Sequence, residues 1–320
     1  MHYLGFDIGG TKCAVVSAKY EDSHLTVCRR ESMPTDLSVS PYEMLDRLIR
    51  TADSILEERP RAIGVSCGGP LDSERGLILS PPNLPGWDAV PIVSLLEEHY
   101  GVCAYLQNDA DACALAEWHF GAGVGARNMV FITFGTGFGS GLILNGRLYS
   151  GTSGNAGEAG HVRLAPDGPV GYGKAGSVEG FCSGGGIARL AFRMAEESLR
   201  SGKRPSFFKE GMTVLDLDAK AVADAARAGD ACALAVFRTS GEYLGRTLAM
   251  LMDILNPECI VIGSVFVRCR DLLWDAARAA IEREALLPTR ACCRVIPATL
   301  GEAIGDYAAI TVALYREEIL

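Results

Sequence analysis

The chain has 320 residues, of which 48% are hydrophobic and 22% are charged, a balance typical of globular proteins. Its formal net charge is −9, and lysine and arginine form no extended run. Because proteins bind nucleic acid largely by neutralising its phosphates with cationic side chains, nucleic acid is excluded as an expected partner. The length is sufficient for two compact lobes.

The cysteine content indicates reduced thiols. There are eleven cysteines, an odd number, and no C-x-x-C pair, which is typical of a cytosolic protein. Six lie in apolar patterns and are expected to be buried: Cys13, Cys67, Cys103, Cys113, Cys232 and Cys259. No secretory leader is evident, and the most apolar helix, 244–255, is too short to cross a bilayer. We therefore expect a cytoplasmic protein with no membrane partner.

The first part of the chain alternates strands with amphipathic helices. Apolar patterns predict strands at residues 3–8, 12–18, 62–67 and 103–107. Helical periodicity predicts helices at residues 41–58, 90–100 and 110–120. A glycine-rich stretch, 121–128, then marks a lobe boundary.

The second part opens on a strand hairpin at residues 130–145, followed by a loop-rich region, 151–186. Helices are predicted at 187–202, 217–228, 230–255, 270–285 and 301–317, with strands at 259–262 and 294–298. This alternation predicts an α/β fold with mixed sheets. We expect an N-terminal lobe, 1–120, joined by the last helix, 301–320, and a C-terminal lobe, 121–300.

Two stretches, 4–18 and 130–145, repeat one pattern: an apolar strand, a glycine-rich turn and a second apolar strand. Backbone N–H groups in such turns can hold phosphate oxygens. The residues concerned are Gly9, Gly10, Thr11 and Lys12 in the first turn, with Asp7 before it, and Thr133, Gly135, Thr136, Gly137 and Gly139 in the second. Either hairpin alone could be an ordinary glycine-rich connection. The pair favours a two-lobed kinase or ATPase that binds a nucleotide.

Asn108 and Asp109 follow a predicted strand and open a helix, which places them where open α/β sheets bind ligands. A carboxylate there suits a general base that takes a proton from an attacking hydroxyl. The alternative is that Asp109 only caps the helix. Asn108 or Asp111 could also be the cap while Asp109 is the base.

A second polar constellation is the loop 154–161, GNAGEAGH, in which Glu158 and His161 lie three residues apart. These side chains could hydrogen-bond to vicinal hydroxyls of a ligand, ligate a metal or make structural hydrogen bonds. A mononuclear metal site lacks its further donors at suitable spacing. Glu179 adds one carboxylate in a glycine-rich loop, and on its own it is weak evidence.

Three further turns are candidate pocket walls or simple connections. They contain Gly69, after a buried strand; Asn83, in PPNLPGW; and Gly263, where small residues would let a flat ring such as adenine approach the backbone. The P-loop motif, the protein-kinase motifs and the G-x-S-x-G elbow do not occur.

These motifs resemble the ROK family of repressors, open reading frames and sugar kinases, within the hexokinase/actin-like ATPase superfamily. The resemblance runs nearly end to end, through FDIGGTK at 6–12, CGGPLD at 67–72, PPNLPGW at 81–87, NDADACALAEW at 108–118, TFGTGFGSG at 133–141, GNAGEAGH at 154–161 and NPECIVIGS at 256–264. It implies a two-lobed, actin-like (ribonuclease H-like) ATPase fold with duplicated mixed sheets and an interlobe cleft.

The resemblance also implies roles for individual residues. The two glycine hairpins would hold the phosphates of ATP, with Gly263 on the adenine side, and Asp109 would be the base. The sugar would contact Gly69, Asn83, Asn108, Asp109, Glu158, His161 and Glu179. Mg²⁺ would bridge the phosphates, with Asp7 holding its water shell.

Two departures from the family pattern are visible. Many members carry a zinc knuckle, but Val170, Tyr172 and Ser177 stand where its three cysteines are expected, so structural zinc is predicted to be absent. The strand that usually ends in three glycines here ends in Gly263-Ser264-Val265. The chain starts at the first hairpin, so the helix-turn-helix of the repressor branch is not expected.

The sequence therefore predicts ATP-dependent phosphorylation of a hexose or N-acetylhexosamine at its 6-hydroxyl, as in a glucokinase, by a homodimer. The 6-hydroxyl is the least hindered alcohol and the usual target in the family. The alternatives are a kinase for allose or a β-glucoside, or a catalytically silent sugar sensor.

Overall fold

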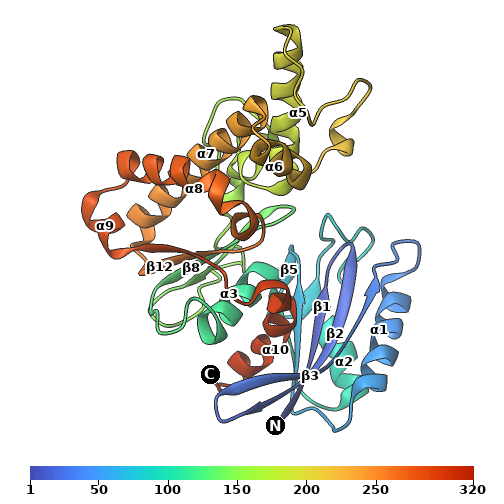
Figure 1. Cartoon of the computed structure of the whole chain (residues 1–320). Coiled ribbons are helices and arrows are strands. Elements are labelled where there is room, and N and C mark those ends of the chain that lie inside the picture. The colour runs from blue at the N-terminus through green and yellow to red at the C-terminus, as the bar shows by residue number, and fades with distance from the viewer. The chain divides into compact units, whose positions relative to one another are not determined.

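A computed structural model describes the whole chain, Met1–Leu320 (Figure 1). The chain forms two compact units. The first unit comprises Met1–Gly125, Leu148–Ala156 and Leu300–Leu320, and the second comprises Ala126–Arg147 and Gly157–Thr299. Each unit is an α/β structure built on its own mixed sheet, and none of its helices is both long and apolar enough to cross a membrane.

The first unit contains a five-stranded sheet in the order β3-β2-β1-β4-β7. Its strands are β1 (His2–Ile8), β2 (Lys12–Glu21), β3 (His24–Pro34), β4 (Ile63–Cys67) and β7 (Ala104–Asn108). Strands β1, β4 and β7 are parallel, whereas β2 and β3 are antiparallel to their neighbours. The carboxyl ends of the three parallel strands therefore lie together at one edge.

Helices cover both faces of this sheet (Figure 1). Apolar side chains of α1 (Pro41–Ile55) and α2 (Ile92–Tyr100) pack on one face, in a core that includes Phe6 and Val65. The other face carries α3 (Asp109–Phe120) and α10 (Ile304–Arg316). The short strands β5 (Leu71–Asp72) and β6 (Leu77–Ile78) form a small separate ribbon.

Helix α10 packs against the sheet at two glycines. A Cβ on Gly64 would overlap the carbonyl oxygen of Ala309, and a Cβ on Gly5 would lie 2.9 Å from the Cβ of Ala309. Only a residue without a side chain lets the helix backbone come this close to β1 and β4. The last 21 residues, Leu300–Leu320, thus belong to the first unit.

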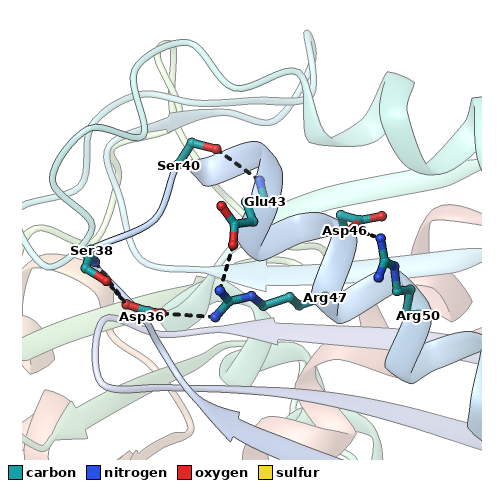
Figure 2. A network of polar contacts seen from close by, with 7 residues as sticks. All are labelled: Asp36, Ser38, Ser40, Glu43, Asp46, Arg47 and Arg50. Atoms are coloured by element: carbon teal, nitrogen blue, oxygen red, sulfur yellow. Dashed lines mark hydrogen bonds and ion pairs between the residues drawn. The ribbon is translucent and has the colours of Figure 1, made fainter.

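Helix α1 begins at a well-defined cap, which Figure 2 shows. Ser40 accepts a hydrogen bond from the backbone N–H of Glu43 at 3.2 Å, and proline follows at the first helical position. Arg47 then bridges Glu43, at 2.7 Å, and Asp36, at 3.0 Å. These ion pairs are exposed to solvent and contribute little to stability, so the cap and the buried face decide where α1 lies.

The second unit contains a four-stranded sheet in the order β13-β12-β8-β9. Strands β8 (Met129–Phe134) and β9 (Phe138–Ile143) form an antiparallel hairpin, while β12 (Cys259–Ile262) and β13 (Arg294–Pro297) add in parallel. The helices of this unit are α4 (Val178–Phe181), α5 (Gly184–Arg200), α6 (Ala219–Arg227), α7 (Ala231–Leu255), α8 (Val265–Glu284) and α9 (Leu287–Cys292). Helices α7 and α8 pack closely because Gly241 and Gly245 bring α7 against the backbone of α8.

The predicted elements mostly recur, with instructive differences. Strand β3 is missing from the prediction because it is a largely exposed edge strand with many polar residues. The region 151–186, predicted as loops, contains α4, the short strands β10 (Val170–Gly171) and β11 (Lys174–Ala175), and a 3₁₀ turn, η1 (Ala159–His161). Two more 3₁₀ turns are η2 (Val214–Asp216) and η3 (Gly301–Ala303), and η3 shortens the predicted last helix.

Helix α8 begins at Val265, five residues before the predicted start. Cys269 has non-helical backbone angles, φ −124° and ψ 23°, so the first turn of α8 is kinked away from the rest. The kink breaks the helical periodicity and hides this turn from a sequence pattern. The short helix α9 was not predicted either, since it spans only six residues.

The predicted burial of Cys103 is wrong. Its side chain is exposed because it lies one residue before β7, after the turn at Gly101, rather than inside the strand. Cys113 and Cys232 are half-buried, and Cys13, Cys67 and Cys259 are buried as predicted.

Candidate functional site

The predicted residues of the first unit meet where β1, β4 and β7 end. In the sheet register Asp7 lies beside Ser66, and Cys67 lies beside Asn108. A Cβ on Gly69 would lie 3.2 Å from Nδ2 of Asn108, and one on Gly68 would lie 3.8 Å from Oδ2 of Asp109. The glycines thus leave open space beside the amide and the carboxylate, at the edge where such sheets bind ligands.

The structure helps to decide whether Asp109 is a helix cap or a candidate general base. Asn108 is the N-cap of α3, and its side chain accepts from the N–H of Ala110 at 3.0 Å. Asp109 is the first helical residue, and its Oδ1 accepts from the same N–H at 2.8 Å. The cap is therefore already supplied by Asn108. Asp109 is exposed to solvent. Desolvation by the atoms packed around its carboxylate nevertheless raises its pKa, against the lowering effect of the Ala110 hydrogen bond.

Asp7 is half-buried beside other carboxylates. Desolvation, followed by the charges of Asp109 and Asp306, raises its pKa from 3.8 to about 6. Arg30 and Lys12 act in the opposite direction. Arg30 is itself paired with Asp306, since its Nε donates to both carboxylate oxygens at 2.8 and 2.9 Å. The result is an acidic centre that has little cationic compensation.

The first glycine turn is fixed by contacts from distant residues. The N–H of Gly9 donates to the carbonyl of Lys12 at 3.2 Å, which closes the turn. The hydroxyl of Thr35 donates to the Gly9 carbonyl at 2.6 Å, and its N–H donates to the Thr11 carbonyl. Gly10 lies directly against the backbone of Asn83. Thr11 and Lys12 point to solvent, where they can reach a ligand.

Thr35 is a positioning residue that sequence reasoning missed. It lies just after β3, an element that the pattern did not reveal. Trp87, the aromatic residue of the PPNLPGW turn, is buried in the apolar core of the first unit. The PPNLPGW turn therefore offers Asn83, and not its tryptophan, to the site.

The second glycine turn joins β8 to β9. Thr133 pairs with Gly139, and its hydroxyl accepts from the N–H of Gly139 at 2.9 Å. The N–H of Gly135 donates to the Gly137 carbonyl at 3.1 Å, and Thr136 is exposed at the tip. The turn thus has the small, backbone-defined shape that the repeat predicts.

Glu179 lies against this turn. Its Oε2 accepts from the backbone N–H of Phe138 at 3.1 Å and would lie 2.8 Å from a Cβ on Gly137. Glu179 is in the first turn of α4, which Ser177 caps by accepting from the N–H of Gly180 at 3.1 Å. One oxygen of this carboxylate is therefore used to position the second glycine hairpin.

Glu158 and His161 flank the 3₁₀ turn η1, which packs on the start of β9. The N–H of His161 donates to the carbonyl of Glu158 at 3.1 Å, so both side chains leave one tight turn. Gly160 touches the carbonyl of Phe138, and the Gly157 carbonyl accepts from the Ser140 hydroxyl. Both side chains are exposed. The second unit thus gathers Glu158, His161 and Glu179 around the beginning of β9.

Gly263 ends β12, where its N–H donates to the carbonyl of Ile132 at 2.9 Å. Gly263 is buried, and a Cβ there would meet the Phe131 ring, the Ala298 side chain and the Ile132 carbonyl at 3.6–3.8 Å, so the structure does not show the open backbone expected for a flat ring. The predicted residues therefore fall into two groups, one in each unit: Asp7, the first turn, Gly69, Asn83, Asn108 and Asp109; and the second turn, Glu158, His161, Glu179 and Gly263.

Hydrogen bonds hold the segment that contains Val170, Tyr172 and Ser177, where many ROK members have the cysteines of a zinc knuckle. Ser177 is fully buried and contacts the Gly171 carbonyl at 3.4 Å, and the Gly176 N–H donates to Pro169 at 3.1 Å. The ring of His161 lies 5.8 Å from that of Tyr172, edge to face. No group of three or more His, Cys, Asp or Glu side chains in the chain is placed to hold a metal. The donor set does not fit a structural zinc ion.

The acidic centre makes stability depend on pH. Because the pKa of Asp7 is raised in the folded state to about 6, its contribution to stability is complete below about pH 4 and is lost as the pH rises through about 6. In the absence of metal and nucleotide, Asp7→Asn should be more stable than the wild type at pH 7.5 by about 3 kcal/mol. The difference should shrink towards pH 4.5. Urea unfolding at both pH values measures it.

Asp22→Asn, in the exposed turn between β2 and β3, removes a carboxylate elsewhere in the same unit and is the matched control. It should change stability little at either pH. An Asp7→Asn variant that is less stable than the wild type at pH 7.5 would show that the Asp7 carboxylate is not penalised by its surroundings.

The hydrogen-bonded segment around Ser177 leads to a second prediction. Purified protein should contain no stoichiometric zinc, and a chelator should leave its unfolding temperature unchanged, because a structural site needs a full ligand set. Elemental analysis and a thermal scan with EDTA test this. One tightly held zinc ion per chain would mean that Cys182 or another thiol had been recruited.

Comparisons with known proteins agree with this geometry. The model of the ROK family matches residues 3–315. The chain is 34% identical over 313 residues to a glucokinase of Halalkalibacterium halodurans, covering 95% of this chain and 92% of that protein. It is 33% identical to an N-acetylmannosamine kinase of Citrobacter koseri, covering 82% of this chain and 83% of that protein.

A solved structure shows the same fold. The ROK family glucokinase from Streptomyces griseus, crystallised with glucose and AMPPNP, superposes with a TM-score of 0.78 at 29% identity, covering 98% of this chain and all of that one. The predicted fold class is thereby confirmed. The ROK family model spans almost the whole chain, and the glucokinase relative is similar over 95% of this chain and 92% of its own length. This chain therefore belongs to the ROK family.

Proposed function

We propose that this protein is a sugar kinase that transfers the γ-phosphoryl group of ATP to the 6-hydroxyl of a hexose or an N-acetylhexosamine. The observation that carries the proposal is the position of Asp109. Its carboxylate stands where the parallel strands of a mixed sheet end, next to two glycines, and Asn108 already caps the helix. The relatives named glucokinase and N-acetylmannosamine kinase support the substrate class.

In this proposal Asp109 accepts the proton of the attacking sugar hydroxyl. A raised pKa brings a carboxylate closer to the pH at which it works, which favours general base catalysis. Asn108 and Gly69 border the same space, and Asn83 lies against the first glycine turn. The N–H groups of that turn bind phosphate oxygens, assisted by Lys12.

The second unit supplies the remaining contacts. Glu158 and His161 offer a carboxylate and an imidazole from one turn, which suits adjacent hydroxyls of a pyranose. Glu179 gives one oxygen to the Phe138 N–H, and its other oxygen would accept from the sugar. A ring with hydroxyls on most carbons satisfies these groups, whereas a nucleoside or an acyl substrate leaves them unpaired at about 1–3 kcal/mol each.

Mg²⁺ fits the acidic centre of the first unit. The pKa of Asp7 is raised first by desolvation and then by the charges of Asp109 and Asp306, so a cation there would be favourable, and oxygen ligands are the ones that Mg²⁺ prefers. The ion would neutralise charge on the phosphates, and Asp7 would hold its water shell. We also propose that the protein is a cytoplasmic homodimer.

A sugar panel with ATP tests the function. Aldohexoses, N-acetylhexosamines and β-glucosides are incubated with ATP and Mg²⁺, and the products are assigned by ³¹P NMR. A 6-phosphate is expected from at least one sugar, with glycerol, nucleosides and acetate inert. An acyl phosphate, or phosphorylation only at the anomeric carbon, would overturn the regiochemistry. Sugar binding without any turnover would identify a sensor instead.

Replacement of the base gives the sharpest test of a single residue. Asp109→Asn keeps the shape but cannot accept a proton, so kcat should fall by about 10²-fold or more while sugar affinity survives. Asp46→Asn, which loses only its exposed ion pair with Arg50 (Figure 2), is the control and should keep full activity. Near-normal turnover by the Asp109 variant would show that Asp109 is only the first residue of α3 and not the base.

A further inference from the structure

Two arginines of the second unit, Arg189 on α5 and Arg268 on α8, form no ion pair. Their neighbours on the same helices or beside them do: Arg193 pairs with Glu197, and Arg227 pairs with Asp271. An exposed arginine without a partner is ordinary. These two differ because both lie beside the second glycine turn.

The guanidinium of Arg189 lies along the first turn of α5. Its Nη1 would be 3.3 Å from a Cβ on Gly185, one helical turn earlier, and its Nε is buried without a hydrogen-bond partner. The N-terminus of a helix carries partial positive charge, so a guanidinium is unfavourable there. An anion would satisfy both the buried N–H and the helix.

The first turn of α5 touches the glycine turn directly. The N–H of Gly184 donates to the carbonyl of Gly135 at 2.8 Å. Helix α8 begins at the same place, since Cγ2 of Val265 would lie 3.9 Å from a Cβ on Gly184. Two long helices, of 17 and 20 residues, therefore start beside Gly135.

Ser264 links Arg268 to this turn. Its Oγ would lie 3.6 Å from a Cβ on Gly135, and it accepts from Nη2 of Arg268 at 3.3 Å. Ser264 has φ 55° and ψ −113°, a conformation that costs a side-chain-bearing residue free energy. Such strain is concentrated at functional sites, where the surroundings impose it.

Arg227 fixes the first turn of α8, which carries Arg268. Arg227 donates from Nη2 to the carbonyl of Arg268 at 2.7 Å, and it is fixed by two hydrogen bonds to Asp271 at 2.9 Å. This brace acts next to the kink at Cys269. Arg268 is therefore presented on a positioned turn.

We propose that Arg189, Ser264 and Arg268 bind the phosphate chain of the nucleoside triphosphate at the second glycine turn. The inference rests on the proposed kinase function. In a chain of net charge −9, two unpaired guanidiniums and two helix N-termini around one turn form a local positive site. The planar fork of arginine matches phosphate oxygens, which gives the site its ligand class.

Neutral variants of matched length test the arginines. Arg189→Gln and Arg268→Gln should each raise the KM for ATP about tenfold, the effect of losing one charge-assisted hydrogen bond, and leave the KM for the sugar unchanged. The controls are Arg193→Gln, one turn further along α5, and Arg270→Gln, two residues along α8, which lies against Trp274. Both controls should keep the wild-type KM for ATP. Equal effects of variants and controls would overturn the proposal.

Ser264→Gly separates binding from folding. Glycine tolerates the backbone conformation, so the unfolding temperature should rise by about 2–4 °C. Loss of the Oγ that holds Arg268 should at the same time raise the KM for ATP. Higher stability with an unchanged KM would show that Ser264 has no part in donor binding.

Calorimetry distinguishes a failure of this inference from a failure of the proposed function. Inorganic tripolyphosphate and ATP are titrated into the wild type and both arginine variants, without sugar. Weaker binding of both ligands to the variants supports the site even if no sugar is phosphorylated. An active wild-type kinase whose arginine variants bind both ligands as tightly as the wild type contradicts it.

Discussion

The first unit depends on the direct approach of one helix backbone to a sheet. Gly5 and Gly64 leave room for α10 at Ala309, and the helix then begins beside the end of β1. There Gly305 lies against the carboxylate of Asp7, and Asp306 receives Arg30 from β3. A side chain at either sheet glycine would displace the helix and, with it, the charges that surround Asp7. Packing and electrostatics are therefore set by the same contact.

The two glycine hairpins share a shape but are supported differently. Thr35 holds the first turn by bonding to its carbonyls, whereas Glu179 holds the second by accepting from the N–H of Phe138. In both cases the supporting residue is far along the chain from the turn. A hairpin that recurs in the sequence thus needs separate support in each place, since a glycine-rich turn has few side chains of its own.

The sequence predicts features that depend on local pattern. Strand β12 is predicted with its observed bounds, because four buried apolar residues follow a proline and precede a glycine. The placement of Asn108 and Asp109 follows from a strand that runs directly into a helix. The contributions of Thr35, Ser264 and Arg268 could not be predicted, since they depend on contacts between residues remote in sequence. For Ser264 the one available signal is a serine where the resembled pattern has glycine.

The position of α10 has a consequence for the order in which the protein can be made. The second unit ends at Thr299, while the first unit is completed only by Leu300–Leu320. On the ribosome the sheet face of β1, β4 and β7 that α10 covers must therefore wait, covered only in part by α3, until Leu300–Leu320 have been synthesised. The later half of the chain can close its core earlier. Domains usually fold in order from the N-terminus, but here the N-terminal unit is the last to be completed.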